Sequence, residues 1–328
     1  MLAKFINNNP TSLQETTSEN QSCFNLRCII NELYNTMKQR KIDKITSNPW
    51  RPGFLGEGHT AKAVVGGQDF EQTDPFIILM DDRVNLPGNE SAGGPHPHAG
   101  FETVTFVLEG NGREFKTGSV ELMTAGKGIV HTEEIKTKTD MRILQLWLAL
   151  PPGKRWAEPF HQEILAEDTP TLRTANTEIK VYSGSSHGLT SPMINHTPLT
   201  LVDFRIEKNS EASQDLPASY NGFIYVVDGA VWVSGKKVEQ GQAAWLERSD
   251  DREDSIIKFS TENEATRFVL YAAEPHHAPI VSHGPFIGDT DDDIRRLYRE
   301  FRQGLMPHLN DIPAEKKIKH QVVPEAKC

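Results

Sequence analysis

The chain has 328 residues, of which 37% are hydrophobic and 24% are charged, and its formal net charge at pH 7 is -10. This length suits one or two domains, of which we predict two, and the composition is that of a globular protein rather than a disordered or membrane-embedded one. The acidic charge disfavours direct binding to nucleic acid or to anionic membranes, and the lack of a long apolar run or a secretory signal predicts a cytoplasmic protein.

The first 49 residues are predicted to form an extension ahead of the main body. Residues 1–22 are rich in Asn, Ser, Thr and Gln and show no apolar period. A helix is predicted next, from an apolar stripe (Leu26, Ile29, Ile30, Leu33, Met37) and from basic residues suited to its C-terminus (Lys38, Arg40, Lys41). The three cysteines, Cys23, Cys28 and Cys328, cannot all pair and are expected to stay reduced.

From Trp50 to about Ile287 the sequence consists of short alternating apolar runs separated by Gly, Pro and Asp, which predicts an all-β sandwich or barrel. One run repeats: the strand that ends at Glu109-Gly110 resembles the strand that ends at Asp228-Gly229. Two related β-domains are therefore predicted, at 50–165 and 166–288. Tryptophans in the strands, Trp147 among them, are expected in the core.

A helix and a charged tail are predicted over 289–328. Acidic residues fill the first turn of this helix, and Gly304 suits its end. Its predicted buried stripe consists of Ile294, Leu297, Tyr298 and Phe301.

Two short motifs in the first β-domain carry side chains that bind metals. His96 and His98 are two residues apart, as are His131 and Glu133, and in a strand such pairs project from the same face. On neighbouring strands the four side chains would share one pocket. This set of donors suits iron, manganese, nickel, copper or zinc, and it leaves coordination positions for a substrate and dioxygen. Glu102 has the same parity as the first two histidines, so it is an alternative ligand or a partner of a ligating imidazole, ranked below Glu133.

The repeat provides an internal comparison for these motifs. At the offset that aligns the two repeated strands, the positions of His96 and His98 are occupied by Asp215 and Pro217. These residues cannot supply the same chemistry. The second domain is therefore predicted to lack a metal site, and the histidines are not required by the fold itself.

The stretches HPHAGFETVTFVLEG and MTAGKGIVHTEE resemble the pirin family of the cupin superfamily, and the similarity extends from about Trp50 to Gly304. The resemblance implies two consecutive cupin domains, each a β-barrel or jelly roll. It also implies one divalent metal in the first domain, bound by His96, His98, His131 and Glu133. Iron(II) is the metal it favours, with zinc, manganese, nickel and copper as alternatives. Ala99 and the Glu134-Ile135 pair depart from residues common in the family.

For function, the resemblance implies a mononuclear metal-dependent dioxygenase, an oxidoreductase like quercetin 2,3-dioxygenase. Its partners would be dioxygen and a flavonol-like or other small enolisable substrate, and Glu133 would remove the hydroxyl proton of that substrate. The alternative is a metal- or redox-sensing protein that regulates a protein partner, with the predicted helix at 26–37 as a candidate contact.

Overall fold

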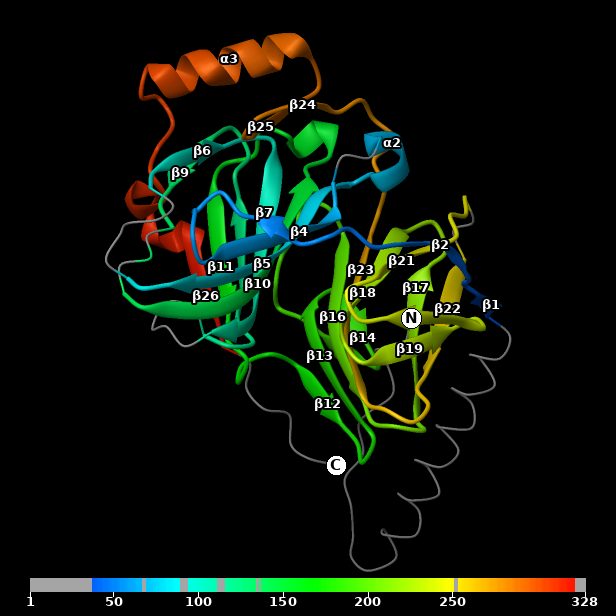
Figure 1. The fold of residues 1–328 in the computed structure, drawn as a ribbon. Helices are drawn as coiled ribbons and strands as arrows, with labels where there is room; N and C mark the ends of the chain where they lie inside the picture. Colours follow the sequence, from blue (N-terminus) through cyan, green and yellow to red (C-terminus); the bar gives the residue numbers. More distant parts are fainter. Residues whose placement is uncertain are drawn as a thin grey trace, which may run out of the picture.

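The computed structural model describes residues 37–66, 69–88, 94–110, 116–133, 135, 137–250 and 253–321. These residues form two β-barrel domains that lie side by side, which confirms the predicted all-β fold (Figure 1). The predicted helix, apart from Met37, and all three cysteines lie outside the described residues. None of the helices in the described part of the chain has the length and apolarity to cross a membrane.

The first domain is built on an eight-stranded sheet and a separate two-stranded ribbon. The large sheet has the order β26-β11-β8-β7-β10-β5-β4-β3, and the ribbon pairs β6 with β9 in antiparallel fashion. The strands are β3 (Arg51–Pro52), β4 (His59–Val65), β5 (Phe76–Leu86), β6 (His96–His98), β7 (Phe101–Gly110), β8 (Val120–Thr124), β9 (Ile129–His131), β10 (Thr139–Ala149), β11 (Phe160–Ile164) and β26 (Lys317–His320).

The second domain has a seven-stranded and a five-stranded sheet. The first comprises β12 (Thr171–Arg173), β13 (Thr177–Ser183), β16 (Leu199–Ile206), β23 (Thr266–Ala273), β18 (Asn221–Asp228), β21 (Ala243–Leu246) and β2 (Ile42–Thr46). The second comprises β1 (Lys38–Gln39), β22 (Asp254–Ser260), β19 (Ala230–Val233), β20 (Lys236–Glu239) and β17 (Glu211–Pro217). Short elements complete the described chain: β14 (Ser185–Ser186), β15 (Leu189–Thr190), β24 (Val281–His283), β25 (Phe286–Gly288), α2 (Phe70–Thr73), α3 (Asp291–Arg302), η1 (Pro152–Lys154), η2 (Leu309–Asp311) and η3 (Ala314–Lys316).

The two large sheets pack against each other through one shared hydrophobic core. Alternate residues of β10, such as Leu144 and Leu146, lie in this core with Phe223 and Tyr271 of the second domain. The other β10 residues, Gln145 among them, face the interior of the first domain, because side chains alternate across a strand. One face of the sheet therefore joins the domains and the other lines a cavity.

Both ends of the described chain cross the predicted domain boundaries. Lys38–Gln39 is a strand that pairs with β22, and Ile42–Thr46 pairs with β21, so this part of the predicted extension belongs to the second barrel. Lys38 is consequently not at a helix C-terminus, in contrast to the sequence prediction. At the other end, Lys317–His320 pairs with β11 of the first domain.

The C-terminal helix forms where it was predicted, as α3. A capping box between Thr290 and Asp293 begins it, and Ile294 and Leu297 are buried. Phe301 is 36% exposed, so its assignment to the buried stripe was wrong. The helix contacts β24 and β25, over which it lies (Figure 1).

Candidate metal centre

Three of the four predicted ligands converge in the first domain. His96 on β6 lies directly opposite His131 on β9, and His98 is on the same face of β6, so the strand register brings the imidazoles together. Ligand-capable atoms of the three side chains all lie within 4.8 Å of one another. The ring centroids of His96 and His131 are 4.3 Å apart, and those of His98 and His131 are 4.9 Å apart.

The surroundings keep two of these imidazoles neutral. Burial, with a smaller contribution from neighbouring histidines, lowers the pKa of His98 to about 2 and that of His131 to about 3. Among the described residues, Nδ1 of His98 and Nε2 of His131 are buried without a hydrogen-bond partner. Buried nitrogen lone pairs without donors are costly unless something binds them, so this donor set fits a divalent transition metal.

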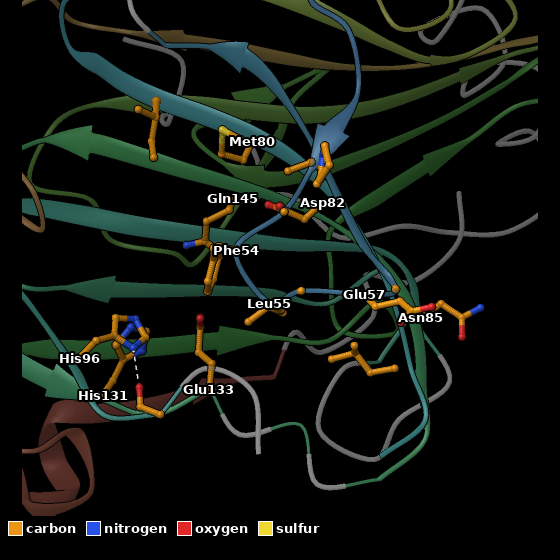
Figure 2. Close-up of a pocket in the computed structure, with 18 of the residues that line it drawn as sticks. Phe54, Leu55, Glu57, Met80, Asp82, Asn85, His96, His131, Glu133 and Gln145 are labelled. Atoms are coloured by element: carbon orange, nitrogen blue, oxygen red, sulfur yellow. Dashed lines mark hydrogen bonds between the residues drawn. The ribbon is translucent and has the colours of Figure 1, made fainter. Parts of the chain in front are cut away.

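Glu133 lies at the same cavity, beyond the end of β9, although its carboxylate is outside the tight histidine group. Figure 2 shows it pointing into the cavity from the same side as His96 and His131. Burial raises the pKa of Glu133, His96 opposes this effect, and the carboxylates of Glu121 and Asp82 add to it. A carboxylate held here can reach a molecule in the cavity.

Glu102 points away from the histidines, toward the second domain. Its carboxylate accepts hydrogen bonds from the Thr124 hydroxyl, the Asn195 amide and the His196 backbone. The parity argument fails because Gly100, between β6 and β7, has a φ of 88°, which interrupts the alternation of the strand. Glu102 is therefore a buried interdomain contact.

The histidines line a cavity of about 1570 Å³. Its wall includes side chains that the sequence analysis did not assign to the site: Asp82, Gln145 and Trp147. Trp147, expected in the core, instead stacks on Phe101 at 4.4 Å and meets His98 edge-on. The alternation of Ile78, Met80 and Asp82 in β5 was the available signal, since these residues share one face.

The C-terminal segment supports the histidine ribbon from outside. Ala99, next to His98, bridges to Phe286 of β25, and Val130, next to His131, bridges to His308. The ring of His308 accepts from the Asn310 backbone at 3.1 Å and lies 2.9 Å from the Thr132 hydroxyl. The ribbon is thus held by chain that is distant in sequence.

The interior of the second barrel differs from that of the first, which contains the cavity. The second barrel is filled by apolar side chains, with Phe204 stacked on Phe268 and Phe259 tilted against both. Asp215 and Pro217, which the offset of the sequence repeat aligns with His96 and His98, lie on β17, which pairs with β22. The described part of this domain holds no comparable histidine group.

Family comparisons agree with this architecture. The model of the pirin family matches residues 58–148, and that of the pirin C-terminal cupin domain matches residues 201–307. Pirin of Rattus norvegicus is 30% identical over 262 residues, covering 75% of this chain and 87% of the rat protein.

Solved structures show the same similarity. A quercetin 2,3-dioxygenase of Acinetobacter baumannii is 26% identical with a TM-score of 0.71, covering 81% of this chain and 98% of that one. A bacterial pirin of Escherichia coli, solved in complex with nickel(II), shares the fold at 16% identity, with a TM-score of 0.51 and coverage of 71% of this chain and 99% of that one. With two barrels matched in order and a cluster of three histidines in the first, this chain belongs to the pirin family of bicupin proteins.

Proposed function

We propose that this protein is a mononuclear metal-dependent dioxygenase that acts on a flavonol-like or other small enolisable substrate. The observation that carries the proposal is the group of His96, His98 and His131, mutually close, with His98 and His131 buried, at the wall of a cavity large enough for a small molecule. The similarity to a quercetin 2,3-dioxygenase supports the choice of reaction.

The histidines and Glu133 would hold the metal, with iron(II) proposed first and zinc, manganese, nickel or copper as alternatives. When bound, such an ion supplies Lewis acidity toward an enolisable hydroxyl and the redox chemistry that dioxygen requires. Neutral imidazoles suit this role, because only an unprotonated ring nitrogen has a lone pair to donate.

The protein's own contribution is to position the substrate and move one proton. Glu133 reaches into the cavity beside the histidines, where a carboxylate oxygen can accept the proton of the substrate hydroxyl. Trp147 and Met80 form an apolar wall that excludes water from the substrate body. We expect Glu133→Gln to lower the rate by about 10² to 10⁴, the usual range for a general base.

The test compares three proteins, each stripped of metal and reloaded with iron(II). Wild type should take up about one iron per chain and consume oxygen in air with quercetin, whereas His98→Ala should do neither. His283→Ala is the matched control, since His283 is exposed and hydrogen bonds to Tyr298 away from the cavity. Oxygen uptake by His98→Ala equal to that of wild type would refute the proposal.

A further inference from the structure

A polar pair lies on the wall of the metal cavity that β5 and β10 form. In the antiparallel register Gln145 pairs with Met80 and Asp82 pairs with Ile143, so Asp82 and Gln145 are diagonal neighbours. Both side chains line the cavity. Figure 2 shows them together on one wall, with Phe54 between them and His96. A molecule bound at the histidines would meet this pair at its remote end.

His59 holds Asp82 in one orientation. The Nε2 atom of His59 is 2.8 Å from Oδ1 of Asp82, and the side chains are 1% and 12% exposed. The backbone N–H of Leu55 donates to Nδ1 of His59 at 3.2 Å, which places the ring proton on Nε2, where it is donated to Asp82. No described residue donates to the other carboxylate oxygen, Oδ2, which is left to accept from a ligand.

The side chain of Gln145 is held so that its amide N–H groups, rather than its oxygen, face the cavity. Its Oε1 atom accepts from the Thr105 hydroxyl at 2.8 Å. No described residue accepts from its amide nitrogen, so two N–H donors remain for the cavity. An acceptor on Asp82 and a donor on Gln145, side by side, match a hydroxyl group, which both donates and accepts.

The polarity and charge of the other lining residues restrict the class of ligand that the cavity can bind. Apolar side chains make up much of the remaining wall, among them Ile78, Met80, Phe54 and Trp147. Three carboxyl groups line it (Glu57, Asp82, Glu133), and no described lining residue is Lys or Arg. At the Asp82 end of the cavity, away from the proposed metal, an anionic group would meet carboxylates with no Lys or Arg to offset the repulsion, so this end favours an uncharged group.

We propose that Asp82 and Gln145 form a hydroxyl anchor that selects aromatic substrates carrying an uncharged hydroxyl group remote from their metal-chelating oxygens. This inference rests on the proposed function only in placing the reacting end of the substrate at the histidines. Asp82 and Gln145 act as specificity residues, and His59 and Thr105 position them.

Zinc-loaded protein tests the anchor by binding alone, because zinc supports no redox turnover. The probes are quercetin, which carries remote ring hydroxyls, and 3-hydroxyflavone, which carries only the chelating oxygens. Wild type should bind quercetin at least about 10-fold more tightly, the value of one hydrogen bond to a charged group. Asp82→Asn should lose that preference by weakening quercetin about 10-fold, with 3-hydroxyflavone changed less than about 2-fold.

Controls separate the anchor from charge and from folding. Glu57→Gln removes an exposed carboxylate of the same cavity and should leave the preference intact. Zinc stoichiometry and thermal unfolding show whether each variant is folded. Gln145→Met should also reduce the preference for quercetin over 3-hydroxyflavone, and it replaces Asp82→Asn as the test of the anchor if Asp82→Asn does not fold. Equal binding of the two probes by wild type, or equal loss in Glu57→Gln and Asp82→Asn, would overturn the anchor. Lack of oxygen uptake with iron would instead refute the proposed reaction and leave this binding result standing.

Discussion

Glu102 should make the stability of this protein depend on pH in a way that a single substitution removes. The side chain is fully buried at the junction of the two domains, and burial raises its pKa from 4.5 to about 7, against three hydrogen bonds that lower it. An acid whose pKa is higher in the folded state binds its proton more tightly there. Its favourable contribution is complete below pH 4.5 and is lost as the pH rises through about 7.

The size of this pH dependence follows from the difference between the folded and unfolded pKa of Glu102. At about 1.4 kcal/mol per pH unit, the folded state loses about 2.5 kcal/mol between pH 5 and pH 8 through Glu102 alone. Glu102→Gln keeps the shape and removes the titration. The free energy of unfolding of wild type, relative to that of the variant, should therefore fall by about 2.5 kcal/mol between these two pH values.

Urea titrations of both metal-free proteins at pH 5 and pH 8 measure this difference. His98 and His131 are present in both proteins, so their own pH dependence cancels in the comparison. Thr124→Val is a useful companion, since it removes one of the hydrogen bonds to Glu102 and leaves the carboxyl group in place. A constant difference between wild type and Glu102→Gln across this range would refute the assigned shift.

Three further predictions concern the site and the domain junction. Gly100→Ala should destabilise the protein by about 2 to 4 kcal/mol and weaken metal uptake, because the φ of Gly100 is 88° and a Cβ atom there would collide with the Ile287 carbonyl. Gly94→Ala, with open space around the added methyl group, should be neutral in thermal unfolding. Tyr225→Phe should lower the free energy of unfolding in urea by about 1 to 2 kcal/mol, since the Tyr225 hydroxyl donates to the buried Asp81 at 2.6 Å. Asp81→Asn should lower it more, by about 3 to 5 kcal/mol, since it breaks the ion pair with Arg142. Equal costs for the two variants would contradict these assignments. The pKa of His98 is lowered to about 2, so the metal-free protein should lose stability as the pH falls below 6.5. Between pH 7 and pH 5, the free energy of unfolding should fall by about 2 kcal/mol less in His98→Leu than in wild type.

Much of the candidate site follows from local patterns in the chain. The spacing of His96 and His98 sets a common face because strand side chains alternate, and the repeat indicated which of the two barrels carries the histidines. Short alternating runs between turn residues were enough to indicate an all-β fold with two related domains. The all-β fold was confirmed and the three histidines lie together in the structure, because each of these two inferences depends on a few consecutive residues.

Features that depend on distant parts of the chain emerge only in the folded molecule. Lys38–Gln39 and Ile42–Thr46 become strands because the second barrel presents them with free edges at β22 and β21, a partner that no local pattern reveals. Glu102 turns toward the second domain because one backbone dihedral at Gly100 reverses the parity. The hydroxyl-binding pair of Asp82 and Gln145 arises from the register of β5 against β10. Strand pairing between segments far apart in sequence settles all three, because hydrogen bonding across a sheet carries no signature within either strand alone.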